Sequence, residues 1–149
     1  MSKFYDPRMH SAEHILNQTM VRLLNSGRSF SAHIEKKKSK CDYHFDRNLT
    51  PEEICIIENK VNEVIKADLN ISEEFLKREE AKRDFNLQRL PEDAGNEIRI
   101  IKIGTYDSCP CSGVHVNSTR EIGGFKIISS DFNGDILRVR FKLTGNDDL

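Results

Sequence analysis

The sequence lacks several features that would assign it to a specialised class of protein. It has no tryptophan, only 7% aromatic residues and four cysteines among 149 residues. So few cysteines do not make the disulfide framework of a small secreted protein, and free thiols or metal ligands are expected instead. No apolar run approaches the roughly 18 residues of a membrane span, and no apolar segment of signal-peptide type begins the chain. We therefore expect an intracellular, cytoplasmic protein with no membrane partner.

A strong charge of either sign is also absent. The 23 basic and 24 acidic residues leave a net charge of −1. This balance argues against a protein that binds polyanions without specificity, although a local basic patch could still contact RNA. Apolar residues make up 37% of the chain and charged residues 32%, as in a globular protein with a core. No repeat or low-complexity tract divides the sequence, so we expect a single domain over residues 1–149.

The first predicted helix, over about residues 8–26, carries two histidines four positions apart. Its apolar stripe repeats about every 3.6 residues and consists of Ala12, Ile15, Leu16, Thr19, Met20, Leu23 and Leu24. Helical spacing places His10 and His14 on one face, about 150° from the centre of that stripe at about 100° per residue. Because neutral imidazole is the commonest protein ligand for a transition metal, the pair is a candidate half of a metal site. The spacing alone more often belongs to an ordinary surface or core histidine pair.

The remaining pattern predicts an α+β fold in which an antiparallel sheet packs with two main helices. The second helix begins at Thr50-Pro51-Glu52-Glu53, which combines a cap, an initial proline and a capping box, and runs to about residue 67. Cys55 is adjacent to the apolar stripe of this helix and is expected to be a packed thiol. Strands are predicted at about 29–35, 41–46, 70–76, 98–103, 124–132 and 135–144, with a short polar helix at 78–83. Asn133-Gly134 is a hairpin signal between the last two strands.

Two groups of basic residues are candidates for RNA contact. The first, the lysine tip, lies between the first two strands and consists of Lys36, Lys37, Lys38 and Lys40. The second is a basic face of the last strand, where Arg138, Arg140 and Lys142 alternate with apolar residues. Either group could contact phosphates, and either could equally be an ordinary solvated surface.

A second pair of potential ligands follows the apolar strand that ends near residue 103. Cys111 and His115 have three residues between them, as His10 and His14 do, and Gly113 lets the backbone turn both side chains toward one point. Three histidines and one cysteine have the softness and geometry for Zn²⁺. The sequence therefore predicts one metal site built from two distant pairs.

Neighbouring residues leave details of this site open. Cys109 could replace a ligand, tune the site or have no role, and Cys111 is favoured because its spacing to His115 repeats the first pair. Asp107 and Glu13 could orient ligating imidazoles, although a solvated glutamate is the more usual interpretation of Glu13. The four ligands could close the site, or could leave one position for water or substrate.

The two ligand pairs and the segments between them resemble, in their order along the chain, the editing domain shared by alanyl- and threonyl-tRNA synthetases. The similar segments are His10-x3-His14, Phe45–Asn62, Leu76–Ala81, Cys111-x3-His115 and Thr119–Gly123. Ser112 and Val114 depart from the Cys-Gly-Gly-Thr-His segment of many relatives. The resemblance covers nearly the whole chain and points to the short free-standing alanyl-tRNA editing proteins of the AlaX type.

The resemblance implies the fold of the second additional domain of those synthetases, and a Zn²⁺ held by His10, His14, Cys111 and His115. It also implies that the protein removes serine from seryl-tRNA(Ala), and in some members glycine from glycyl-tRNA(Ala), with the tRNA acceptor end as partner. Ser29 matches a threonine that lines the amino-acid pocket, with Ser31 as the alternative, and Gly113 is a further candidate for substrate contact.

Other functions stay open at this point. The same chemistry could act on seryl-tRNA(Thr). The chain could also be a non-catalytic, zinc-stabilised tRNA-binding module, or a metallohydrolase of small substrates for which the lysine tip is irrelevant. No catalytic residue beyond the metal and a water is assigned from the sequence.

Overall fold

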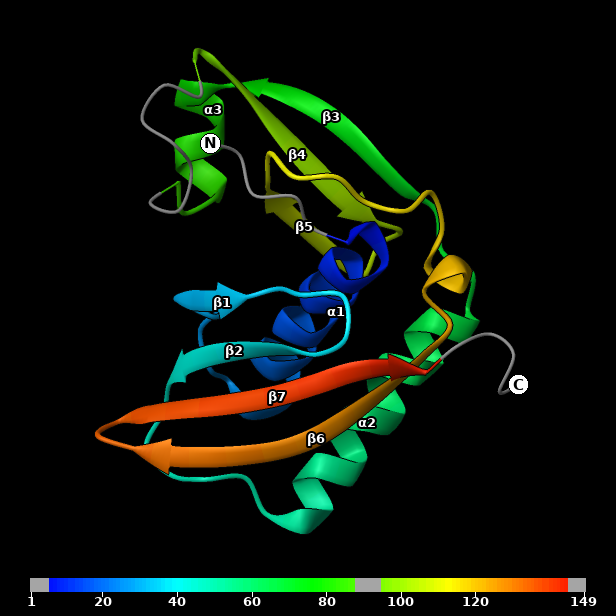
Figure 1. Cartoon of the computed structure of the whole chain (residues 1–149). Coiled ribbons are helices and arrows are strands. Elements are labelled where there is room, and N and C mark those ends of the chain that lie inside the picture. Colours follow the sequence, from blue (N-terminus) through cyan, green and yellow to red (C-terminus); the bar gives the residue numbers. More distant parts are fainter. Residues whose placement is uncertain (1–5, 88–94, 145–149) are drawn as a thin grey trace.

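Two antiparallel sheets lie on either side of the first helix in the computed structural model, which describes residues 6–87 and 95–144 (Figure 1). The helices are α1 (Pro7–Leu24), α2 (Pro51–Lys66), α3 (Arg78–Asp84) and the 3-10 turn η1 (Thr119–Ile122). The strands are β1 (Ser31–His33), β2 (Ser39–His44), β3 (Ile71–Lys77), β4 (Glu97–Ile103), β5 (Asp107–Pro110), β6 (Gly124–Asn133) and β7 (Ile136–Thr144). The larger sheet has the order β1-β2-β7-β6 and the smaller β3-β4-β5. The predicted α+β class is confirmed, and the antiparallel strands are divided between two sheets.

Helix α1 begins and ends with specific caps. The Asp6 side chain accepts hydrogen bonds from the backbone N–H groups of Arg8 (3.0 Å) and Met9 (3.1 Å), and Pro7 occupies the first turn. These contacts satisfy donors that would otherwise lack partners at a helix start. At the other end Asn25 adopts the left-handed conformation, with φ 56°. The two caps define where α1 begins and ends, and this determines where each side chain lies around and along the helix.

Helix α2 has the predicted capping box. The Thr50 hydroxyl accepts from the Glu53 N–H at 3.1 Å, and the Glu53 carboxylate accepts from the Thr50 N–H at 2.9 Å. Its buried positions are Ile57, Val61, Val64 and Ile65. Cys55 is exposed, so the expectation of a packed thiol was wrong. It lies outside the buried stripe, on the solvent side of the helix.

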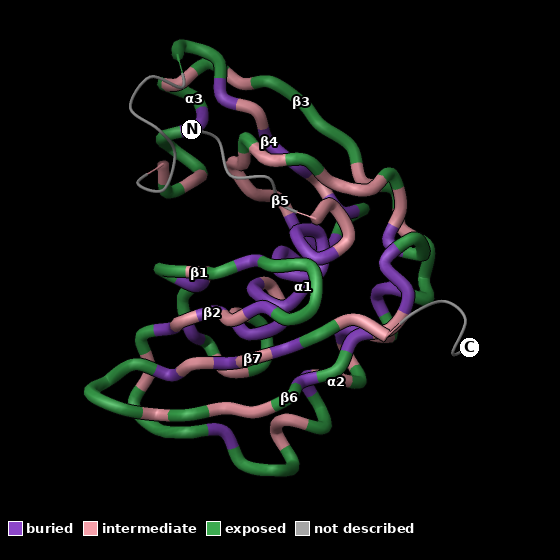
Figure 2. Tube along the Cα trace, viewed as in Figure 1, coloured by how far each residue is buried: buried purple, intermediate pink, exposed green. Residues whose placement is uncertain are grey.

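The main core lies between the larger sheet and helices α1 and α2. Buried residues of α1, α2 and β7 form one continuous cluster, and Figure 2 shows α1 buried along most of its length. On β7, Leu137, Val139 and Phe141 are fully buried while Arg138 and Arg140 are not. This alternation is the one that the sequence predicts for the last strand. A second, small cluster under α3 contains Ala81, Ile98 and Ile100.

The hairpin between β6 and β7 turns at Gly134 and Asp135, which both have positive φ (57° and 66°). The predicted turn at Asn133-Gly134 is therefore present one residue later, with the two left-handed residues of a tight hairpin. The stretch between the predicted helix at 78–83 and the predicted strand at 98–103 includes residues 88–94, which lie outside the described residues. No helix in the described part of the chain is long and apolar enough to cross a membrane.

Candidate metal centre

The N-terminal half of α1 presents His10 and His14 to the smaller sheet and to the segment after β5. Both histidines are only 4% exposed, and neither belongs to the apolar clusters. The prediction that the pair points away from the apolar stripe of its helix is consistent with this placement. The sequence did not indicate that the smaller sheet and the segment after β5 cover the histidine face of α1 and bury His10 and His14.

The loop after β5 carries the second pair and is held by Arg99 of β4. Arg99 Nη1 donates to the carbonyl oxygens of Cys111 (3.1 Å) and Gly113 (2.6 Å), and the Cys111 N–H donates to the Arg99 carbonyl at 3.1 Å. Gly113 lies against the His10 ring, because a Cβ atom built on Gly113 would be 2.3 Å from His10 Cε1. Any larger residue would push the loop or the ring aside, so the glycine allows the loop to approach α1.

The structure brings the two predicted pairs together. One donor atom from each of His10, His14, Cys111 and His115 lies within 4.8 Å of the others. The Cys111 Sγ is 3.4 Å from His10 Nε2. The three imidazole rings are 4.2–5.0 Å apart between centroids. Nitrogen and sulfur donors in such a cluster suit a tetrahedral Zn²⁺.

Two of the histidine rings are oriented by hydrogen bonds at Nδ1. His10 Nδ1 donates to the Val114 carbonyl at 3.0 Å, and His115 Nδ1 pairs with Ser11 Oγ at 3.0 Å. Holding Nδ1 in this way leaves Nε2 of these two rings for a metal. Consistent with that, His115 Nε2 is buried without a hydrogen-bond partner among the described residues, and so is His14 Nδ1, which lies 3.7 Å from Asp107 Oδ2. These observations fit a metal site better than a packed histidine cluster.

The electrostatics of the cluster favour a thiolate. Burial would raise the pKa of Cys111, but hydrogen bonds with His10, His115 and His14 outweigh it and lower that pKa to about 3. Burial also disfavours the charged form of His14, yet its contacts with Asp107 and Cys111 raise its pKa to about 9. For His115 burial prevails and lowers the pKa to about 4. A thiolate and a neutral imidazole are the forms that bind Zn²⁺.

Asp107, the first residue of β5, links α1 to the segment before β1. Its carboxylate accepts from Gln18 Nε2 at 3.0 Å and from both Arg28 terminal nitrogens, at 2.7 and 3.3 Å. Although burial opposes it, the charged form is favoured by His14 and Arg28, which lower the pKa of Asp107 to about 2. Asp107 is 3% exposed. A buried carboxylate with this many donors holds His14 in place relative to β5.

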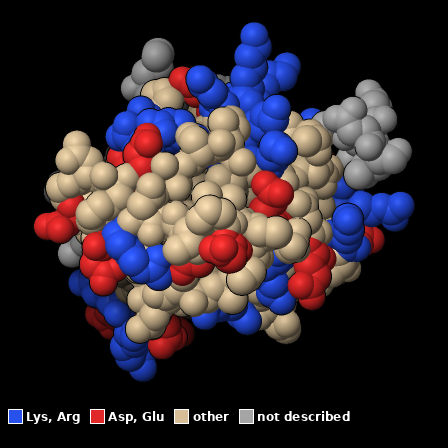
Figure 3. Space-filling model, turned by 90° about the horizontal axis from the view of Figure 1, so that it is seen from below, with Lys and Arg blue, Asp and Glu red and all other residues tan. Residues whose placement is uncertain are grey.

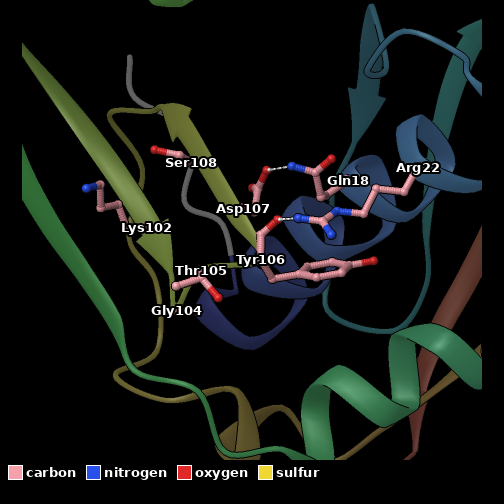
Figure 4. Close-up of a pocket in the computed structure, with 8 residues that line it drawn as sticks. All are labelled: Gln18, Arg22, Lys102, Gly104, Thr105, Tyr106, Asp107 and Ser108. Atoms are coloured by element: carbon pink, nitrogen blue, oxygen red, sulfur yellow. Dashed lines mark hydrogen bonds between the residues drawn. The ribbon is translucent and has the colours of Figure 1, made fainter.

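A cavity of about 380 Å³ opens beside Asp107, between α1 and the β4–β5 turn (Figure 4). Gln18 and Arg22 extend into it from α1, and Arg22 donates to the Tyr106 carbonyl at 2.7 Å. With His10 and His14, these two residues form a row at four-residue spacing along α1. One face of a single helix therefore lines both the cluster and this cavity.

Cys109 lies apart from the four-donor cluster. Its thiol is 3.4 Å from the Pro110 carbonyl oxygen, and burial raises its pKa to about 12. A thiol that retains its proton is a poor metal ligand. The geometry therefore distinguishes the two cysteines, and the spacing argument chose the one that lies with the histidines.

The other predicted site residues are spread more widely. Ser29 is 2% exposed, and its N–H donates to Asn17 Oδ1 at 3.2 Å, whereas Ser31 is exposed on β1. Asn17 Oδ1 also accepts from the Tyr43 hydroxyl at 2.7 Å. Asn17 is three residues after His14, so the residue that holds the Ser29 N–H lies within about one helical turn of a predicted ligand. No pattern in the sequence indicated a role for Asn17 or Tyr43.

The two basic groups have different surroundings. The first three lysines of the lysine tip are exposed in the β1–β2 turn, while Lys40 is half-buried in β2. On β7, Arg138 is paired with Asp42, and Arg140 with Asp131. Figure 3, the face turned downward in Figure 1, shows acidic and basic side chains interspersed. The lysine tip is therefore the less neutralised of the two candidates for phosphate contact.

Glu13 is the largest departure from expectation at the site. The sequence favoured a solvated glutamate, but the residue is 5% exposed, so that interpretation was wrong. The prediction failed because the periodicity of α1 identifies only one buried face, and α1 is covered on several sides. Arg99 and Ser11, which hold the loop and a ligand ring, were also missed.

Comparisons with known proteins agree with this geometry. The family model described as the threonyl and alanyl tRNA synthetase second additional domain matches residues 98–139. Alanine–tRNA ligase of Coxiella burnetii (strain Dugway 5J108-111) is 35% identical over 130 residues, which are 87% of this chain and 15% of that protein. The corresponding ligase of Thermoanaerobacter sp. (strain X514) is 33% identical over 139 residues, covering 93% of this chain and 16% of the relative.

The chain spans only 15% of the length of the first of these relatives, so the comparison concerns one part of a much longer enzyme. Within that part the similarity runs through nearly all of the described residues. The chain belongs to the alanyl- and threonyl-tRNA synthetase editing-domain family, the second additional domain of those enzymes.

Proposed function

We propose that this chain hydrolyses the ester bond of wrongly charged tRNA, with seryl-tRNA(Ala) as the leading substrate and glycyl-tRNA(Ala) as a second. The observation that carries the proposal is the cluster of three histidines and one cysteine, with His10 and His14 buried and Cys111 and His115 half-buried, in a domain of this family. The partner is the acceptor end of tRNA, and the reaction takes place in the cytoplasm.

Zn²⁺ is the proposed cofactor, held by His10, His14, Cys111 and His115. When bound, it supplies a Lewis acid for the ester carbonyl or for a water. The chain supplies the orientation of its ligands. Val114 and Ser11 each bond one imidazole at Nδ1, and Asp107 lies 3.7 Å from Nδ1 of the third, which supports one donor atom from each residue lying within 4.8 Å of the others.

Ser29 is the proposed contact for the amino acid. In support of this, the Ser29 N–H donates to the side chain of Asn17, which follows His14 by three residues on α1. A pocket that hydrogen-bonds the serine hydroxyl leaves its own polar group unpaired when alanine is bound. Discrimination of this type reaches about 10⁴-fold or more, whereas an apolar pocket alone separates such amino acids poorly. The correct product, alanyl-tRNA(Ala), is thereby spared.

The lysine tip is the proposed contact for the tRNA backbone. Its three leading lysines are exposed and adjacent in the turn between β1 and β2. Phosphate contacts of this kind position a nucleic acid without reading its sequence. Substrate choice then depends on the amino-acid pocket and on parts of the tRNA that meet the rest of the surface.

The test is a deacylation assay with purified, zinc-loaded protein. We expect loss of serine from seryl-tRNA(Ala) well above the uncatalysed rate, and little loss of alanine from alanyl-tRNA(Ala). Cys111→Ala should abolish the activity and reduce bound zinc, while Cys55→Ala, which removes an exposed thiol, should change neither. Repeating the assay with seryl-tRNA(Thr) separates the two tRNA specificities.

A non-catalytic module gives a different result in the same assay. The four protein donors could fill a closed structural site. In that case the protein would bind tRNA and zinc, and the ester would decay at its uncatalysed rate. That outcome would overturn the proposed function.

A further inference from the structure

The larger sheet has one face covered by helices and one face exposed to solvent. Helices α1 and α2 pack on the first face, where Leu137, Val139 and Phe141 of β7 join the core (Figure 1). The second face is formed by the alternate residues of β2, β7 and β6, and none of the helices in the described part of the chain covers it. Its charged side chains are those of Lys40, Asp42, Lys126, Asp131, Arg138, Arg140 and Lys142. Five cations therefore share the exposed face with two carboxylates.

Four of these cations lie directly opposite one another on neighbouring strands. Lys40 of β2 is the register partner of Arg140 of β7. Lys142, two residues further along β7 and on the same face, is the register partner of Lys126 of β6. Residues in such positions have Cβ atoms about 4.5–5.5 Å apart, and like charges there destabilise a sheet. These four residues, which we call the basic corner, repel one another on a surface where the packing of the core does not require any charge.

The carboxylates of the exposed face do not neutralise the whole basic corner. Each is paired with an arginine, Asp42 with Arg138 and Asp131 with Arg140. The three lysines of the corner have no ion pair with any described residue. The pKa of Asp42 is lowered first by its hydrogen bond with Arg138, and the charges of Lys40 and Arg140 add to this effect. The corner therefore acts as one positive field with an excess of cations.

The basic corner is close in the fold to the lysine tip and to the metal cluster. Lys40 is also the last residue of the lysine tip, so the two groups are continuous. Lys126 is four residues beyond Ile122, which is about 13 Å of extended strand. The Ile122 carbonyl accepts from the Arg8 guanidinium at 2.9 Å, two residues before His10 on α1. A long polyanion whose end reaches the cluster can therefore also contact the corner.

From this arrangement we propose that the basic corner is a docking surface for the phosphates of an RNA duplex, the acceptor stem of the tRNA, an inference that rests on the proposed function. Lysine and arginine side chains neutralise phosphates without reading the base sequence. Single-stranded RNA is typically held by aromatic rings that stack on its bases, and the corner consists of aliphatic cations alone. Duplex RNA is instead recognised mostly through its shape and its backbone, and this is the recognition that a charged sheet face provides.

The test measures binding of an RNA hairpin that copies the acceptor stem of tRNA(Ala), by fluorescence anisotropy at several salt concentrations. The hairpin carries no amino acid, so binding is measured whether or not an ester is hydrolysed. In Lys126→Ala/Lys142→Ala we expect the Kd to rise about tenfold and the slope of log affinity against log salt concentration to decrease in magnitude by up to about 1.8, which is about 0.9 for each lost contact. Lys77→Ala/Lys82→Ala is the matched control, because it removes two exposed lysines beside the smaller sheet, and it should change neither quantity.

Urea unfolding separates a binding role from a structural one. Lys142→Glu replaces the repulsion with Lys126 by an attraction between opposite charges. Its urea midpoint should therefore be at least as high as that of the wild type, while its affinity for the hairpin falls about tenfold or more. Loss of RNA binding together with loss of stability would show that the lysines support the fold, and would overturn the inference. An unchanged affinity and salt slope in both variants would overturn it as well.

Two further comparisons identify the partner and separate this inference from the proposed function. Vesicles of phosphatidylcholine and phosphatidylserine should bind weakly, and vesicle binding that depends on Lys126 and Lys142 without hairpin binding would overturn the inference in favour of a membrane surface. If the hairpin binds through the corner but seryl-tRNA(Ala) decays at its uncatalysed rate, the proposed function fails and the docking surface stands. If Lys126→Ala/Lys142→Ala hydrolyses seryl-tRNA(Ala) with an unchanged kcat/KM, the docking surface is overturned and the proposed function stands.

Discussion

Replacing Asp107 with asparagine should damage both the fold and the metal site. The Asp107 carboxylate is fully buried and accepts from Gln18 and from both terminal nitrogens of Arg28, the nearest at 2.7 Å. Asparagine keeps the shape but has one acceptor oxygen and no charge, so the Arg28 guanidinium loses its counterion. Removing one partner of a buried ion pair costs about 3–5 kcal/mol. Because the Arg28 side chain is 29% exposed, the lower end, about 3 kcal/mol, is expected.

The loss at the metal site is separate from the loss of stability. Asp107 Oδ2 lies 3.7 Å from His14 Nδ1 and orients that ring. Mutation of such a partner typically lowers metal affinity about 10- to 100-fold. The two effects are measured by urea unfolding of the metal-free protein and by competition for Zn²⁺ with a chelator of known affinity.

A matched control makes the prediction specific. Asp131→Asn removes the carboxylate of an exposed ion pair with Arg140, which should cost at most about 1 kcal/mol and leave Zn²⁺ affinity unchanged. If Asp107→Asn is no more destabilising than Asp131→Asn, the buried network does not hold α1 to β5 and our account of it is wrong.

The same network predicts a dependence on pH. The folded pKa of Asp107, about 2, is below the unfolded value of about 3.9. The carboxylate therefore stabilises the fold above about pH 4, and this contribution is lost as the pH falls through about 2. The lost contribution is about 3 kcal/mol, since each pKa unit corresponds to about 1.4 kcal/mol. Asp107→Asn should lack this part of the acid dependence, and identical acid unfolding of both proteins would contradict the assignment.

Three further predictions concern the metal and the tRNA. Gly113→Ala places a Cβ 2.3 Å from His10 Cε1 and should lower Zn²⁺ affinity at least tenfold in a chelator competition, whereas Gly27→Ala, which meets nothing within 4 Å, should not. In the metal-free protein His14 has a pKa of about 9, so Zn²⁺ must displace the proton of His14 near pH 7. Affinity should then rise with pH up to about pH 9 and level off, and calorimetry in several buffers should detect proton release, whereas binding without proton release would contradict this. Replacing the four lysines of the lysine tip by alanines should weaken tRNA binding without changing kcat at saturating tRNA. The slope of log affinity against log salt concentration should decrease in magnitude by up to about 0.9 for each lost phosphate contact. An unchanged slope would show that the tRNA binds elsewhere on the protein.

Local signals in the sequence predicted the helices well. The capping box at Thr50 and the proline after it are contacts within a few residues, and α2 begins where they indicate. The alternation on β7 was equally reliable, because one face of that strand packs on a continuous core. Helix caps and strand alternation depend on residues that are close in the sequence, and therefore they can be predicted without knowledge of the tertiary structure.

Features that depend on distant neighbours could not be predicted. Strand β5 is four residues long and contains Cys109 and Pro110, so propensity alone does not identify it, and it forms because β4 offers its edge. The burial of Glu13 depends on which elements cover α1 from the other side. The division of the strands into two sheets likewise follows from tertiary packing and has no local signature.

For the candidate site, spacing found the two ligand pairs, and their proximity became visible only in three dimensions. Each pair satisfies a local rule for helix or loop geometry. The hydrogen bonds that orient two of the rings come from a serine and a backbone carbonyl, and an aspartate of another segment lies 3.7 Å from the third ring. Such contacts leave no pattern along the chain, which is why Ser11 and Arg99 were missed.

The separation of the two ligand pairs has a consequence for how the protein is made. Cys111 is 101 residues from His10, so a chain emerging from the ribosome has no complete set of donors until His115 has been synthesised. Zn²⁺ would then act as a late cross-link between α1 and the loop after β5. By closing so long a loop it would restrict the unfolded chain as a disulfide does, by about 4–5 kcal/mol for a loop of about 100 residues. Removal of the metal should therefore loosen α1 first, a change that hydrogen exchange of its backbone amides would detect.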